Sequence, residues 1–315
     1  MPKSMTRIAR QVRAELCFQL FSRRLLLVAV VLFGGVVVSF TGSVSSASSA
    51  NASFIRQVAV FEEHGITLED ALATPSSVTR NGSSETIDNP LKYDYLVVSK
   101  AMAAVHGTAM AGTALDLSTF VVIPLLFLIL GAGTASHDRI SGASQIRASR
   151  ERWGAVVTAK VVVLGLVSVA APLFVAVAGR LAPVVASTPV DRLTGDISYD
   201  LVPVGASPLL PKLVMTAMVA FAFSLAGYAI AWLTRSTSWP LVAAALGLFV
   251  LPFVAAWDPR NVLAVLAAGV YDFWGQFQLR PPIAMTHSAA LAAAVGYLVA
   301  LVVLVAASAR RVPVR

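Results

Sequence analysis

Cationic side chains gather in one short stretch of the chain, between two long apolar runs. This stretch extends from Gly131 to Lys160, and its only acidic residues are Asp138 and Glu151. Its basic residues are Arg139, Arg147, Arg150, Arg152 and Lys160. Guanidinium and ammonium groups bind carboxylates through charge-assisted hydrogen bonds. The stretch therefore predicts the binding of an acidic surface, and the elements around it determine where that surface lies.

The sequence lacks the motifs of most other chemistries. No GxxxxGK[ST] pattern is present, so a Walker-type phosphate loop is excluded. There is no HExxH motif, and Cys17 is the single cysteine, which excludes a multi-cysteine metal site. The four histidines lie far apart, and we expect them to be structural or surface residues: His64, His106, His137 and His287. We predict neither an enzyme nor a bound cofactor or metal in this chain.

The flanking apolar runs predict membrane-spanning helices. The chain of 315 residues is 57% hydrophobic and 13% charged, outside the usual range of soluble domains. A span needs about 20 mostly apolar residues. Six stretches without Asp, Glu, Lys or Arg qualify: 25–44, 117–135, 161–179, 213–234, 239–257 and 288–309. The predicted fold class is an all-α integral membrane protein with six transmembrane helices.

The distribution of charge orients these spans. Fifteen of the 24 Lys and Arg residues fall before the first span, in the 136–160 loop, in the turn around Arg235 and at the C-terminus. The same segments hold three of the 16 acidic residues. By the positive-inside rule these segments are cytoplasmic, and so are both termini. The net charge of +8 thus indicates topology in the cell (plasma) membrane, and no nucleic-acid partner is expected.

Residues 1–24 predict a helix that lies in the cytoplasmic membrane interface. Arg7, Arg10 and Arg13 fall on one side of a helical wheel, opposite an apolar face that includes Val12. Arginines on such a helix are expected to contact lipid phosphates. The alternative is a helix docked on the rest of the protein.

Two outer segments are expected to have structure of their own. The first, 45–116, predicts a compact helical cap, with a Ser/Ala linker and a turn region at 74–90. Its helices are expected near 54–63, 68–73 and 91–114. The second segment, 258–287, contains an apolar run at 262–270 that is too short to cross a bilayer. We interpret it as a re-entrant or interfacial segment on the outer side.

This layout resembles that of type-2 ABC transporter permeases, the transmembrane subunits of many exporters. The resemblance covers the predicted topology of the whole chain, which includes residues 117–315 and the segments before them. It includes a short motif of acidic–x–x–Ser–Gly, here Asp138-Arg139-Ile140-Ser141-Gly142, followed by Arg150 and Lys160. The chain departs from the family pattern at Ala143-Ser144-Gln145, where a threonine and a basic residue are usual, and it lacks a proline before Arg150.

The resemblance implies that the 136–160 loop is a coupling helix, which fits a groove on an ABC ATP-binding subunit. The implied coupling residues are Asp138, Arg139, Ile140, Ser141, Gly142, Ile146, Arg147, Arg150 and Arg152. ATP and Mg would be bound by two copies of that subunit. Charge reversal at Arg147 and Arg150 together is expected to release it in a pull-down. The alternative is a basic loop that serves orientation only.

The family also implies a dimer with a second permease copy, identical or not, and a path along spans two and five. The lining residues on those spans would be Phe120, Pro124, Phe127, Phe249, Pro252 and Phe253. Because this lining carries no charge, it favours export of a hydrophobic or amphipathic substrate, with membrane lipid as neighbour or cargo. One alternative is a non-transporting scaffold or signalling subunit whose outer segment binds a partner. The other is an intramembrane enzyme, which is disfavoured because this chain lacks a cluster of polar residues within its spans.

Overall fold

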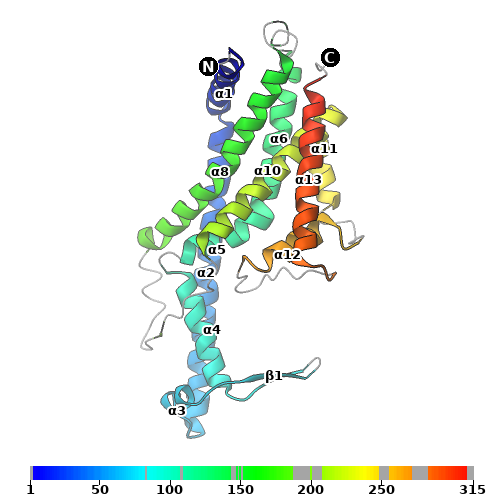
Figure 1. The fold of residues 1–315 in the computed structure, drawn as a ribbon. Coiled ribbons are helices and arrows are strands. Elements are labelled where there is room, and N and C mark those ends of the chain that lie inside the picture. Colours follow the sequence, from blue (N-terminus) through cyan, green and yellow to red (C-terminus); the bar gives the residue numbers. More distant parts are fainter. Residues whose placement is uncertain are drawn as a thin grey trace.

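A computed structural model of the chain describes most of its residues, and Figure 1 shows their arrangement. The described ranges are 3–81, 84–106, 109–142, 147, 149, 152–186, 199–200, 208–247, 255–271 and 283–310. The helices within them are α1 (Lys3–Phe21), α2 (Arg24–Glu63), α3 (Leu68–Ala73), α4 (Pro90–Ala104), α5 (Ala109–Leu117), η1 (Ser118–Val122), α6 (Ile123–Ile140), α8 (Trp153–Val185), α10 (Leu209–Thr234), α11 (Trp239–Ala245), α12 (Pro259–Ala267) and α13 (His287–Ser308). The strands β1 (Val78–Asn81) and β2 (Ser84–Ile87) pair antiparallel.

Among the described residues, five helical stretches are long and apolar enough to cross a membrane. They are Arg24–Glu63, Ala109–Ile140, Trp153–Val185, Leu209–Thr234 and His287–Ser308. Each contains one of the predicted spans or nearly all of it, which is the pattern of an α-helical multi-pass membrane protein. The remaining predicted span, 239–257, begins as α11, but residues 248–254 lie outside the described part. The count of six therefore stays a prediction.

The two ends of the helical bundle differ, as Figure 1 shows. At one end lie α1, the end of α6 at Ile140 and the start of α8 at Trp153, and we call this the loop end. At the opposite end α2 continues past the other long helices, together with α3, α4 and the β-hairpin. We call this projection, residues 45–104, the stalk and this end of the bundle the stalk end.

The stalk depends on the length of α2, which exceeds the predicted first span. α2 has 40 residues, or about 60 Å at 1.5 Å per residue, twice the roughly 30 Å of a bilayer core. The expected Ser/Ala linker after residue 44 is wrong, because this stretch is helical. It contains no proline or glycine to interrupt a helix, and Ala47 and Phe54 are buried where α4 packs along α2. The helix stops before Gly65, whose φ is +80°.

The rest of the 45–116 segment also differs from a compact cap. The short helix expected near 68–73 is confirmed as α3, and Thr67 caps it by accepting a hydrogen bond from the amide of Asp70. The helix expected over 91–114 is interrupted, since α4 ends at Ala104 and α5 begins at Ala109. The hairpin β1–β2 was not predicted, although the Asn81-Gly82 pair in the 74–90 turn region is a hairpin signal.

The core of the bundle is the contact between α6 and α10, the most extensive between any two described helices. A Cβ atom added to Gly131 of α6 would lie 1.9 Å from the carbonyl oxygen of Ser224. A Cβ atom added to Gly227 of α10 would lie 2.1 Å from the carbonyl oxygen of Leu128. The two backbones therefore touch, which only glycine permits at these positions. This contact fixes α6 against α10 between the two ends of the bundle.

Candidate functional site

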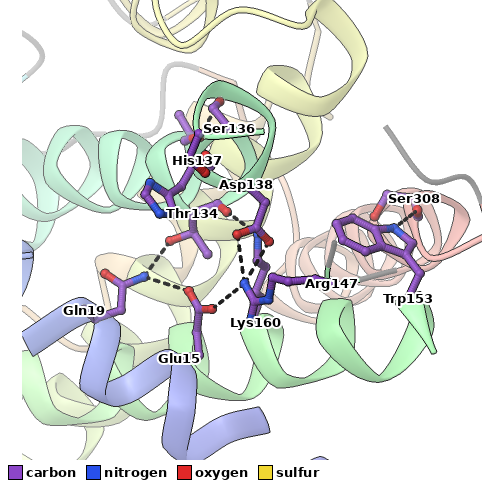
Figure 2. A network of polar contacts seen from close by, with 12 residues as sticks. Glu15, Gln19, Thr134, Ser136, His137, Asp138, Arg147, Trp153, Lys160 and Ser308 are labelled. Carbon is purple, nitrogen blue, oxygen red and sulfur yellow. Dashed lines mark hydrogen bonds and ion pairs between the residues drawn. The ribbon is translucent and has the colours of Figure 1, made fainter. Parts of the chain in front are cut away.

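The candidate site lies at the loop end, where α6 and α8 approach the predicted coupling loop (Figure 2). Asp138, in the last turn of α6, is only 2% exposed. Arg147 Nη1 donates to its Oδ1 at 2.8 Å, and Lys160 Nζ lies 3.0 Å from its Oδ2. One carboxylate therefore joins a loop residue to a residue of α8.

Lys160 strengthens the connection between α6 and α8. Its side chain is almost fully buried, and its Nζ donates to the carbonyl oxygen of Thr134 at 2.7 Å. A buried ammonium group is costly unless it is paired and hydrogen-bonded. Here both requirements are met from α6 alone, by the Asp138 carboxylate and the Thr134 carbonyl.

Helix α1 contributes a stripe of polar side chains to the same site. Gln11, Glu15 and Gln19 are spaced four residues apart, so they share one helix face, and all three are buried. Gln19 Nε2 donates to Thr134 Oγ1 at 3.1 Å and to Glu15 Oε1 at 3.4 Å. Glu15 Oε2 lies 3.5 Å from Arg147 Nη1. The helix is thus docked on the protein through its polar face, which is the alternative to a purely interfacial helix.

The remaining faces of α1 leave room for contact with lipid. Arg10 and Arg13 are exposed, and so are the apolar Leu20 and Phe21 near the end of the helix. The side chain of Arg7 lies outside the described part. An interfacial position for these exposed residues stays a prediction.

Four ionisable side chains form what we call the charge cluster: Glu15, Asp138, Arg147 and Lys160. Its two carboxylates and two cations balance, so the cluster is neutral overall when all four are ionised. Arg147 is partly exposed, whereas the other three are buried. Removal of one partner of a buried pair typically costs about 3–5 kcal/mol. The cluster therefore anchors the loop firmly to α1, α6 and α8.

Aromatic contacts surround the charge cluster. The rings of Phe18 and His137 stack with centroids 4.1 Å apart, and the guanidinium of Arg24 lies 5.4 Å from the centre of the Phe18 ring. Trp153 Nε1 donates to the carbonyl oxygen of Ser308 at 3.1 Å (Figure 2). These contacts attach α1 to α6, and α8 to α13, at the same level as the ion pairs.

The acidic–x–x–Ser–Gly motif acts as a helix end. Gly142 has a φ of +71° and its amide donates to the carbonyl oxygen of Arg139 at 3.2 Å, while Ser141 donates to His137. Glycine adopts this left-handed conformation without steric cost, so Gly142 terminates α6. Asp138, one turn earlier, points into the protein, whereas Ile140 is 69% exposed.

Apart from Gly142, which ends α6, the predicted coupling residues fall into three groups. Asp138 and Arg147 pair with each other, and Arg139 donates to the carbonyl oxygen of Arg235. Three residues are exposed at the loop end: Ile140, Ser141 and Arg152, which precedes α8. Ile146 and Arg150 lie outside the described residues, whereas residues 153–160 form the first turns of α8. A coupling role stays a prediction for all of them.

The predicted translocation path is described on one side only. Pro124 and Phe127 are buried in the core of a single chain, just after the π-helical turn η1, which accommodates the missing amide of the proline. The Phe120 ring meets the ring of Tyr271 edge-on at 5.0 Å. Phe249, Pro252 and Phe253 lie outside the described residues. On this side of the path, Phe120 alone is not fully buried.

A second polar cluster, at the stalk end, was not predicted. Lys212 Nζ of α10 lies 3.0 Å from Asp116 Oδ1 of α5. The hydroxyls of Thr119 and Thr216 lie 2.8 Å apart, and Tyr271 Oη lies 2.9 Å from that of Thr216. We call these five residues the hydroxyl cluster. It connects α5 and η1 to α10 and to the segment that follows α12.

Residues of both clusters stand beside the predicted spans in the sequence. Asp116 and Asp138 flank the span 117–135, and Lys160 and Lys212 directly precede the next two spans. A prediction of spans from apolar windows places these charged residues at the helix ends, where charged side chains are expected to be exposed to solvent. The available signal was the opposite sign of these residues, since at each end of the bundle one span is bordered by an Asp and another by a Lys.

These arrangements define a class of protein and no more specific identity. The described residues hold no group of three His, Cys, Asp or Glu side chains that could bind a metal ion. Comparison with models of known families, with curated proteins and with solved structures gave no match. The long apolar helices and the charges buried at their ends are those of an α-helical, multi-pass membrane protein.

Proposed function

We propose that the chain is the permease subunit of an ATP-driven ABC transporter that exports a hydrophobic or amphipathic substrate. In this proposal six spans cross the plasma membrane, and the loop end faces the cytoplasm with both termini. Two ABC ATP-binding subunits supply the energy, and they hold the ATP and Mg. A second permease copy, identical or not, completes the membrane part.

The observation that supports this proposal most is the double pairing of Asp138. Its carboxylate binds Arg147 in the loop and Lys160 in α8 at once, and Glu15 of α1 approaches the same arginine. A force on the loop is therefore passed to three helices through buried ion pairs that resist separation. A loop that served orientation alone would need cations at a solvated surface, without this internal bracing.

The exposed tip of the loop end suits contact with a partner. Ile140 is a large apolar side chain in a surface position, and Arg152 is exposed at the start of α8. Apolar side chains form the core of many protein interfaces, and arginine is enriched there. Arg147 is less suited to this role, because its guanidinium already pairs with Asp138.

A pull-down tests the proposal. The tagged chain is purified from its native membrane, and bound ATPases are labelled with a photoreactive ATP analogue. We expect the double variant Ile140→Asp/Arg152→Glu to reduce the labelled partner at least about tenfold, as loss of an interface hot spot would. Arg310→Glu, which changes an exposed charge near the C-terminal end of α13, should retain it. Absence of any ATPase from the wild-type sample would overturn the proposal.

The stalk supports a second candidate, a non-transporting scaffold or signalling subunit. α2 and α4 project beyond the bundle and offer a surface to a partner on that side (Figure 1). The reconstituted complex separates the two candidates. A transporter should show ATPase activity that rises with added cargo, whereas a scaffold should respond to the stalk's partner and not to cargo.

A further inference from the structure

An apolar groove lies between α8 and α10. It has a volume of about 450 Å³ and runs from the middle of the bundle toward the stalk end. α8 lines it with residues from Gly165 to Leu173, and α10 lines it with residues from Leu210 to Phe221. Nearly all of its lining is apolar, and both helices are among those that can cross a membrane.

The shape of the groove depends on small residues in its lining and on larger, exposed residues at its rim. Gly165 has no side chain to fill the groove, and a Cβ there would be 3.6 Å from the ring of Phe221, which also lines it. Ala217 is a second small residue in the lining. Val169 and Met218 stand at the rim, each about half exposed. The groove is therefore open to the hydrocarbon that surrounds these helices.

A cation stands above the groove on the same helix face. Arg180 follows Leu173 by seven residues of α8, which is two turns and about 10 Å along the axis. Its side chain is exposed, and it forms no hydrogen bond or ion pair with the described residues. It directly follows the predicted span 161–179, at the depth where lipid headgroups lie.

We propose that this groove binds one acyl chain of an anionic phospholipid in the leaflet on the stalk side, with the headgroup phosphate at Arg180. The apolar lining matches the chain, and the guanidinium fork matches the phosphate oxygens. Hydrocarbon is the expected occupant of the groove, because the interior of the bilayer contains lipid and protein but no water. The site is independent of the ATP-coupled role proposed above.

Native mass spectrometry tests the site with the full-length protein, in detergent micelles that contain phosphatidylglycerol or phosphatidylcholine. We expect the wild type to retain one phosphatidylglycerol, with about a tenfold preference over phosphatidylcholine from the charged contact. Ala217→Phe should fill the groove and abolish retention of either lipid. Ala170→Phe, the same change at an exposed position of α8 outside the groove, should bind as the wild type does.

Two further variants separate the two parts of the site. Arg180→Gln should lose the preference for phosphatidylglycerol and keep a weak retention of both lipids, whereas Arg180→Lys should keep most of the preference. Met218→Trp, at the exposed rim, provides a second block of the groove if Ala217→Phe does not fold. Retention by both blocked variants at the wild-type level, or equal retention of the two lipids by the wild type, would overturn the proposal.

The competing occupant is a second copy of this chain. Met218→Cys in a Cys17→Ser background places a single thiol at the rim, since Cys17 is the only native cysteine. In membranes, a short bismaleimide should leave this variant monomeric if lipid fills the groove. Efficient cross-linking between chains would show an interface in place of the lipid site.

Discussion

Each end of the bundle buries a lysine–aspartate pair with the same 3.0 Å separation, but the neighbours of the two pairs differ. At the loop end, Asp138 and Lys160 are joined by a second acid and a second base. At the stalk end, Asp116 and Lys212 stand beside hydroxyl groups from Thr119, Thr216 and Tyr271. The side chains of the first pair are 2% and 3% exposed, and those of the second are 7% and 12% exposed.

The difference shows two ways in which polar groups hold membrane helices together, through buried ion pairs and through hydrogen bonds between hydroxyl groups. Charges at the loop end connect segments that are not continuous, including a loop residue, and they are costly to separate because they are buried. Hydroxyls at the stalk end also connect segments that are distant in the sequence, but each of their hydrogen bonds contributes modestly. We therefore expect the loop end to respond to substitution more strongly than the stalk end.

The strongest test of this comparison measures two separate variants, Lys160→Met and Lys212→Met. The first leaves Asp138 buried without its ammonium partner, so we expect a loss of about 3–5 kcal/mol in the free energy of unfolding. The second should cost less, because Asp116 and Lys212 are more exposed. Unfolding in detergent, followed by tryptophan fluorescence, measures both.

A compensating variant serves as the control for this pair. Lys160→Met leaves the charge cluster with one excess negative charge, so Asp138→Asn in that background restores its neutrality and should recover part of the lost stability. Equal losses at Lys160 and Lys212, or no recovery in the double variant, would contradict the difference between the two ends.

The helix contact between the two clusters provides the next test. Gly227→Ala would place a methyl group 2.1 Å from the carbonyl oxygen of Leu128, and overpacking of this kind costs about 1–3 kcal/mol. Gly296→Ala on α13 is the matched control, since no other described segment comes within 4 Å of its added Cβ. A loss at Gly227 with none at Gly296, in the same unfolding assay, is the expected result.

Smaller effects are expected within the hydroxyl cluster. Thr216→Val removes the shared partner of Thr119 and Tyr271, and one hydrogen-bonded hydroxyl contributes about 1 kcal/mol. Thr158→Val, at an exposed position where the hydroxyl's one bond within the described structure is to Gly154 of its own helix, should leave stability unchanged. A loss at Thr216 as large as that at Lys160 would remove the distinction between ionic and hydroxyl bracing.

The smallest effect concerns a tyrosine that packs on the stalk. Tyr199 stacks on Tyr95 and donates to Asn51, and burial, helped by the nearby Tyr95, raises its pKa from 10 to about 12. The protonated phenol is favoured in the folded state, so its contribution is complete below pH 10 and is lost as the pH rises from 10 to 12. The thermal midpoint should fall over this window, and Tyr199→Phe should reduce that fall. An unchanged pH profile in the variant would show that Tyr199 is not the group responsible.

The spans were the most predictable part of the fold. Five of the six predicted stretches correspond to long apolar helices, and α3 falls where its pattern indicates. The stalk was predicted less well, because a run of serine and alanine is compatible with linker and helix alike, and the packing of α4 on α2 decides between them. The hairpin was missed for a similar reason, since a turn signal does not reveal the pairing on either side.

The candidate site was predictable in its location but not in its geometry. The basic stretch and the Asp138–Gly142 turn were singled out from residue types and spacing. The inward direction of Asp138, its pairing with Arg147 and the polar stripe of α1 were not, because a helical wheel of α1 weighs hydrophobicity and cannot show which face meets the protein.

By itself, the sequence determined that this chain belongs in a membrane, since the transfer of a helix into lipid depends on the apolar content of one continuous window. The tertiary structure alone decided which charged residues are exposed and which are buried in ion pairs. Glu15, Asp138 and Lys160 lie far apart in the chain, and their ion pairs form because α1, α6 and α8 converge at one end of the bundle. No local window contains that information, because the energy of a buried charge depends on partners contributed by distant segments.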